Sequence, residues 1–118
     1  MQDFPTAAEL VEAVREFLDA DIFPSVEGRK RFHTRVASNV LAIVERELLQ
    51  GAAADARESE GLAALMPDAS GTLAERNAEL AERIRAGTLA ASREELVAHL
   101  RATTRDKLAI ANPRYLRD

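Results

Sequence analysis

The chain has 118 residues, enough for one domain with a single hydrophobic core. Its 16 basic and 20 acidic residues give a net charge of −4, so the composition does not indicate a nucleic-acid-binding protein. Because cysteine is absent, disulfides, thiolate catalysis and cysteine-ligated metals are excluded.

Two further classes are disfavoured by the pattern of apolar residues. No apolar run approaches the ~18 residues that span a membrane. Residues 1–5 lack the basic region and apolar stretch that open a secretory signal. We therefore expect a cytoplasmic protein with no membrane partner.

The first predicted helix begins with a capping box. Thr6 is placed to accept a hydrogen bond from the backbone of Glu9, and the Glu9 side chain to return one. Pro24 disfavours the helical conformation at Phe23, so the helix should stop or kink there. The apolar stripe of this helix consists of Ala7, Leu10, Val11, Val14, Phe17 and Leu18.

Residues 32–50 form the predicted central helix, and Gly51 is expected to end it. Placed at about 100° per position, its apolar residues cover roughly half of the circumference. A helix at the surface needs a narrower stripe, so we expect two or three neighbours to pack against it. The apolar residues are Phe32, Val36, Ala37, Val40, Leu41, Ile43, Val44 and Leu48.

Polar residues on the central helix fall into two groups. Arg35, Asn39 and Arg46 share one side and form a polar stripe. His33 and Glu47 fall inside the apolar arc, where buried ionisable groups need partners. They lie 14 residues apart in the sequence, about 21 Å along a helix axis, so they do not share one site unless the helix breaks.

A basic cluster, residues 29–31 together with Arg35, precedes and opens the central helix. Cations at a helix N-terminus oppose the helix dipole, so helix stability alone does not explain it. It is either a solvated helix start or a contact for an acidic partner or a phosphate.

Three more helices are predicted downstream. A short one covers residues 55–65, anchored by Leu62, Leu65 and Met66. A second capping box opens a helix over residues 72–86, which Gly87 ends, and Asn77 on its apolar side is expected to hydrogen-bond. A third capping box, at residues 92–95, opens the last helix, which runs to residue 111 before Pro113.

Together these signals predict an all-α protein. We expect a single domain over residues 1–118, folded as an up-and-down bundle of four main helices plus one short helix. Agreement between the capping boxes and the helical periodicity supports this fold class.

Lys107 lies on the apolar arc of the last helix, as Glu47 and Asp21 lie on apolar sides of theirs. In a bundle, Lys107 could pair with Glu47 or Asp21. The pair would then be a buried or half-buried ion pair that fixes helix register. Alternatively, Lys107 snorkels to the surface. In a third interpretation His33, Glu47 and Lys107 line a polar pocket between helices.

No catalytic residue, cofactor or metal ligand is predicted. The chain has two histidines, His33 and His99, the latter expected on the polar side of the last helix. Neither belongs to the Glu-x-x-His motif of di-iron bundles. Residues 112–115 have the form of an Asn-Pro-x-Tyr peptide, but a proline-stopped helix with Tyr115 packed back on the bundle explains them as well.

Four blocks of the sequence, residues 3–10, 31–47, 77–81 and 107–115, resemble a small bacterial family of unknown function. Members of that family are often encoded beside aminoglycoside-phosphotransferase-like kinases and acyl-CoA dehydrogenases. The resemblance covers nearly the whole chain and brings no catalytic residues with it. It implies an association with the kinase-like proteins.

Two classes of function follow. The favoured one is a non-enzymatic accessory or interaction protein that docks on a kinase-like partner through Arg35, Asn39, Arg46, Arg114 and Tyr115. The alternative is a small-molecule-binding protein or enzyme that uses the polar pocket. Homodimerisation through a helix face is a third possibility.

Overall fold

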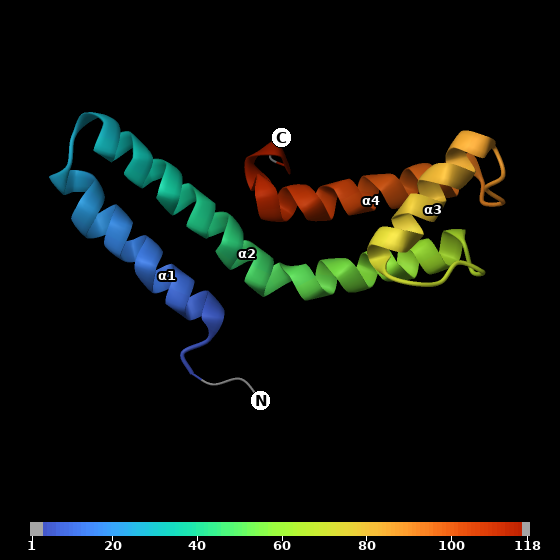
Figure 1. Cartoon of the computed structure of the whole chain (residues 1–118), viewed down its shortest axis with the longest axis horizontal. Coiled ribbons are helices and arrows are strands. Elements are labelled where there is room, and N and C mark those ends of the chain that lie inside the picture. Colours follow the sequence, from blue (N-terminus) through green and yellow to red (C-terminus); the bar gives the residue numbers. More distant parts are fainter. Residues whose placement is uncertain (1–3, 117–118) are drawn as a thin grey trace. The chain divides into compact units, whose positions relative to one another are not determined.

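The computed structural model describes residues 4–116, and every regular element in that part of the chain is helical (Figure 1). The four α-helices are α1 (Ala7–Phe17), α2 (Gly28–Leu65), α3 (Leu73–Ala86) and α4 (Arg93–Ala111). A π-helical turn (Leu18–Ile22) and a 3₁₀ turn (Phe23–Ser25) follow α1, and a second 3₁₀ turn (Pro113–Leu116) follows α4. The prediction of an all-α protein is confirmed.

The first two capping boxes form as predicted. At the start of α1, the Thr6 hydroxyl accepts from the Glu9 amide at 3.2 Å, and the Glu9 carboxylate accepts from the Thr6 amide at 3.1 Å. The same pair of bonds joins Thr72 and Glu75 at 3.1 and 3.0 Å. Each box satisfies two backbone N–H groups that have no partner within the helix.

The third capping box, formed by Ser92 and Glu95, has only one of its two backbone hydrogen bonds. Ser92 accepts from the Glu95 amide at 3.1 Å, but the Glu95 carboxylate accepts from the Ser92 hydroxyl instead of its amide. At the other end of α3, Gly87 adopts the left-handed conformation with φ of 71°, as the sequence predicts for a helix terminator.

The predicted end of the central helix is wrong. Gly51 lies inside α2, which runs 38 residues from Gly28 to Leu65 and includes the short helix predicted over residues 55–65. A helical glycine costs about 1 kcal/mol relative to alanine and does not break the hydrogen-bond ladder as proline does. The three alanines that follow Gly51 favour continued helix.

The chain divides into two compact units, Met1–Gly51 and Ala52–Asp118, and α2 contributes to both. In the first unit, α1 lies beside the first part of α2 (Figure 1). An ion pair of 2.7 Å between the Arg15 guanidinium and the Glu45 carboxylate joins the two helices. That hydrogen bond raises the pKa of Arg15 above its ordinary value. The side of α2 that carries Glu45 also carries Ser38, which is 3% exposed.

The second unit holds the hydrophobic core. Leu62 and Leu65 at the end of α2, with Met66 directly after it, meet Leu80 of α3, and Leu62 is fully buried. The predicted anchoring by Leu62, Leu65 and Met66 is therefore confirmed. Partly buried side chains around this core are Ala69, Leu73, Leu89, Ala91 and Leu96.

Polar contacts fix α3 and α4 against α2. Asn77 of α3 donates to the Glu58 carboxylate of α2 at 2.8 Å, which confirms the hydrogen-bonding role predicted for Asn77. On the other helix, Arg57 of α2 makes two hydrogen bonds to the Asp106 carboxylate of α4, of 2.9 and 3.1 Å. Paired geometry of this kind fixes the orientation of two helices as well as their distance.

Stability should depend on pH through the pair formed by Asp68 and Arg83. The guanidinium hydrogen-bonds both carboxylate oxygens at 3.0 and 2.8 Å and holds the pKa of Asp68 below its ordinary value of 3.8. Because the folded-state pKa is the lower one, the contribution is present above that ordinary value. It is lost as the pH falls through the folded-state pKa.

We therefore expect Asp68→Asn to lower the midpoint of urea unfolding at pH 7 and to have little effect at about pH 2. Asp55→Asn, at another aspartate, on α2, serves as the matched control. An Asp68→Asn effect of equal size at both pH values would contradict this account.

Candidate interaction surface

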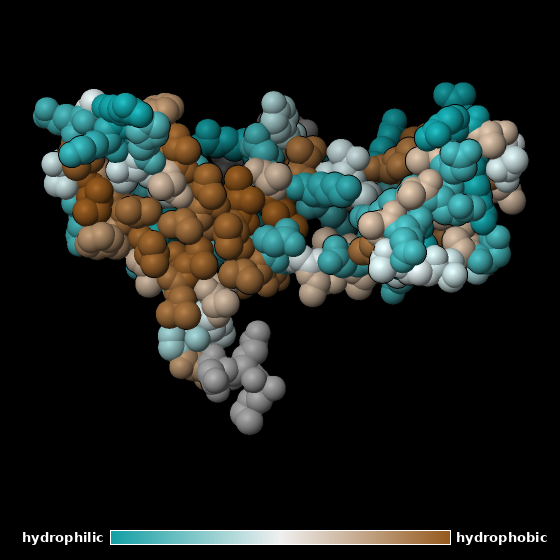
Figure 2. Space-filling model, viewed as in Figure 1, coloured by the Kyte–Doolittle hydropathy of each residue, from teal (hydrophilic) through white to brown (hydrophobic). Residues whose placement is uncertain are grey.

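The first unit carries an exposed apolar surface, which we call the hairpin face. Figure 2 shows apolar residues gathered over α1 and the first part of α2. Their exposure ranges from 37% at Ile43 to 65% at Phe32. The hairpin face comprises Leu10, Val14, Phe17, Phe32, Val36, Val40, Ile43, Val44 and Leu48.

This surface stays exposed because α1 packs against the side of α2 that carries Glu45 and Ser38, and not against the centre of the apolar arc. Glu45 marks that side, since it pairs with Arg15 of α1. At about 100° per residue, Val36 and Val40 lie on the far side of α2 from Glu45. The central helix was predicted to pack against two or three neighbours. Within the described part of the first unit, α1 and the two turns that follow it contact this helix, and most of the predicted apolar arc stays exposed.

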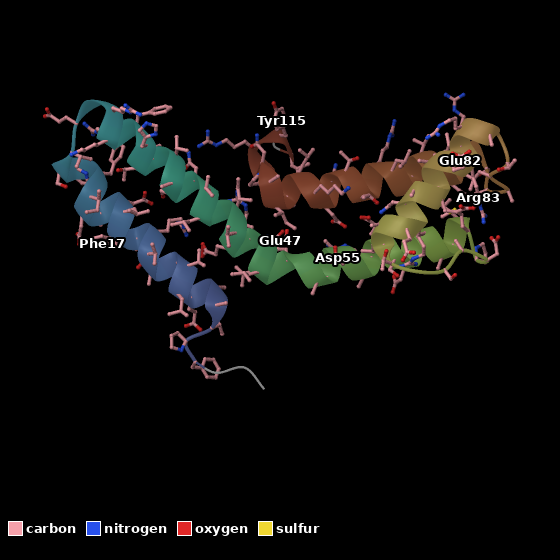
Figure 3. The ribbon with its side chains drawn as sticks, viewed as in Figure 1. Phe17, Glu47, Asp55, Glu82, Arg83 and Tyr115 are labelled. Atoms are coloured by element: carbon pink, nitrogen blue, oxygen red, sulfur yellow. The ribbon has the colours of Figure 1, made fainter. Side chains whose placement is uncertain are left out.

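His33 and Glu47 both lie among the residues of the hairpin face. The Nε2 atom of His33 accepts a hydrogen bond of 3.2 Å from the Arg29 guanidinium. Glu47 is on α2 (Figure 3). Its carboxylate lies 2.7 Å from the position that a Cβ on Gly51 would occupy.

The basic cluster at the start of α2 is organised by an aromatic ring. The guanidinium groups of Arg31 and Arg35 lie 4.5 and 4.1 Å from the centre of the Phe23 ring. Arg35 is also 3.7 Å from the Asp19 carboxylate. Cation–π contacts of this kind stabilise by about 0.5–1 kcal/mol at exposed sites. These contacts explain why Arg31 and Arg35 stand at the start of α2, where the helix dipole alone would disfavour cations.

The remaining residues of the predicted docking surface lie in two places. Arg46 and the exposed Asn39 belong to α2 in the first unit, on the same stripe as Arg35. Arg114 and Tyr115 belong to the 3₁₀ turn after α4 in the second unit. Tyr115 is 75% exposed, so the expectation that it packs back on the helices is wrong (Figure 3).

The residues predicted to form a buried ion pair or a polar pocket are not buried. Asp21 and Glu47 belong to the first unit, and Lys107 is on α4 in the second. His33, the third residue of the predicted pocket, is exposed and hydrogen-bonded to Arg29. A pocket formed by His33, Glu47 and Lys107 stays a prediction.

A groove that the sequence did not predict lies between the end of α2 and α4. It has a volume of about 530 Å³. His99 of α4 was expected on the polar side of its helix, but it packs against Gly61 of α2. The signal for this close approach was a glycine and small residues at helical spacing on both helices. The groove is lined by Arg57, Glu58, Gly61, Ala64, Leu65, Glu95, Ala98, His99, Ala102, Thr103, Arg105 and Asp106.

The helices and the exposed hairpin face define an all-helical protein that presents apolar surface to its surroundings. Among the described helices, none contains an apolar stretch that would span a lipid bilayer. The chain belongs to the family of the domain of unknown function DUF6285, whose model matches residues 24–115. This agrees with the resemblance to an uncharacterised family. Neither a curated protein nor a solved structure matches the chain significantly.

Proposed function

We propose that this chain is a non-catalytic accessory protein that acts by binding other protein chains, among them an aminoglycoside-phosphotransferase-like kinase. The hairpin face is the observation that carries the first part of the proposal. Contiguous apolar patches of this kind on soluble proteins typically mark interaction sites. The kinase-like partner is suggested by the resemblance to a bacterial family whose members are often encoded beside such proteins.

For the kinase-like partner, the polar residues offer the better contacts. Arg114 and Tyr115 stand exposed at the end of α4, and arginine and tyrosine are enriched among the residues that dominate binding energy. Asn39, Arg35 and Arg46 provide a second polar patch on α2. These residues lie outside the hairpin face, which leaves that face for another occupant.

Co-expression with the kinase-like protein of its gene neighbourhood tests this proposal. We expect the two proteins to co-purify, and Tyr115→Ala to weaken the complex at least about tenfold, because truncation of a central tyrosine costs more than about 1.4 kcal/mol. Arg85→Ala, an exposed change on α3, is the matched control. If the two proteins do not associate in a titration, the kinase-like partner is excluded.

The groove between α2 and α4 supports a second candidate function, the binding of a small molecule. Its volume falls within the range of ligand pockets, about 300–1,000 Å³. Its lining combines small apolar residues with the imidazole of His99 and the carboxylate of Glu58. A thermal-shift screen of wild type against His99→Gln tests it. Compounds that raise the melting temperature of the wild type and of His99→Gln equally would argue against this site.

A further inference from the structure

We propose that the hairpin face binds a second copy of this chain, with the two α2 helices antiparallel and a two-fold axis passing at Val40. In this arrangement His33 of each copy faces Glu47 of the other. The inference rests on the proposed function only in that the chain acts through protein contacts. It does not require the kinase-like partner.

The size of the hairpin face fits a dimer. It carries nine large apolar residues, each roughly half exposed, which together present on the order of 800 Å². A stable and specific interface buries about 800 Å² on each partner. In addition, the first unit has no large apolar side chain buried among its described residues. Its hairpin therefore depends on a second surface to bury apolar area.

The order of residues along α2 is complementary to itself about Val40. When two α2 helices pair antiparallel with the two-fold axis at Val40, the numbers of any two facing residues add up to 80. Val40 then meets its own copy, and Val36 meets Val44. Phe32 meets Leu48 in the same way. Apolar residues thus face apolar residues on both sides of the axis, as a two-fold interface requires.

The same register pairs the polar residues of the face. Glu47 is an acid within an apolar surface, and covering it without a partner would be costly. At a sum of 80 its counterpart is His33, whose Nδ1 is the ring nitrogen that the contact with Arg29 does not occupy. Arg29, one turn earlier, adds positive charge beside the same carboxylate. Sliding one helix by a turn in one direction would set Glu47 against Ala37 and leave the acid unpaired. Sliding it the other way would set Leu48 against the glycine that begins α2.

The first test is the mass of the full chain in solution, measured by sedimentation equilibrium. We expect twice the 12.9 kDa of one chain. Val40→Glu places two carboxylates together at the axis and should raise the dimer dissociation constant at least about 100-fold. Leu49→Glu is the matched control. Leu49 lies half a turn from Val40 on the same helix, is 67% exposed, and should leave the dissociation constant within about threefold.

Because Val40→Glu could disturb folding, a charge exchange at the polar pair gives a second test. His33→Glu sets two acids opposite each other, and Glu47→Arg sets an arginine beside Arg29 of the other copy, so each variant alone should dimerise at least about tenfold more weakly. When the two variants are mixed, the introduced acid at position 33 faces the introduced arginine at position 47. The original histidine and glutamate occupy the other contact. The mixture should form a heterodimer, with an affinity close to that of the wild type.

Oxidation of cysteine variants tests the register directly, since the described residues contain no cysteine and the sequence has none. Val40→Cys should form a disulfide-linked dimer, and Leu49→Cys should not. A wild-type monomer at high concentration would overturn the proposal. A dimer unaffected by Val40→Glu or by both charge variants would overturn it too. Co-purification with the kinase-like protein is scored separately, so the two proposals fail independently.

Discussion

Replacing Leu62 by alanine is expected to lower the free energy of unfolding by about 3–5 kcal/mol. Leu62 has no exposed surface and lies in contact with the cluster of Leu65, Met66 and Leu80. Alanine would leave a cavity that helices fixed by the Arg57–Asp106 and Asn77–Glu58 contacts do not readily close. The loss is a large part of the roughly 5–15 kcal/mol that stabilises a typical domain.

Guanidinium unfolding followed by far-UV circular dichroism measures this effect. Leu49→Ala is the matched control, because it changes the same residue type on the same helix at a position that is 67% exposed. We expect a change of less than about 0.5 kcal/mol there. Equal effects at residues 49 and 62 would show that the core is not where the structure has it.

Gly61→Ala should destabilise the protein by about 1–3 kcal/mol, although alanine ordinarily favours a helix over glycine by about 1 kcal/mol. A Cβ at residue 61 would overlap the His99 imidazole, so the ring would have to move or α2 and α4 would have to separate. Because Gly61 lines the groove between these helices, any affinity for a small molecule should change as well.

The cause of this effect can be isolated by removing the ring. In a His99→Ala background the overlap is absent, and Gly61→Ala should then stabilise the helix by up to about 1 kcal/mol. Gly51→Ala is the control in the native background. Its new Cβ would meet the end of the Glu47 side chain, which can rotate away. If Gly61→Ala destabilises both backgrounds equally, His99 is not the reason.

Local signals predicted the helices well, because helix starts depend on residues close in sequence. Thr6 with Glu9 and Thr72 with Glu75 form the boxes that their spacing indicates. The sequence predicts a helix end at Gly51 because glycine is common after helix ends. This weak penalty is overridden here because the three alanines after Gly51 favour helix and the last turn of α2 buries Leu62 and Leu65.

The candidate site could be predicted only in part. Periodicity correctly placed an apolar arc on the central helix, but it does not show what covers that arc. Exposure of Asp21 and Lys107 depends on the pairing of distant helices, which no local pattern records. The stacking of Arg31 and Arg35 on Phe23 likewise requires the turn between α1 and α2 to bring the ring back over the helix.

Because one continuous helix serves both units, its stability should vary along its length. Backbone amides near Leu62 are held by a buried core, whereas those near Val40 belong to a hairpin without one among the described residues. In the monomer, hydrogen exchange should therefore be slow at the C-terminal end of α2 and faster before Gly51. Any chain that covers the hairpin face would slow exchange in that first part of α2, so a single helix would report the occupancy of the surface.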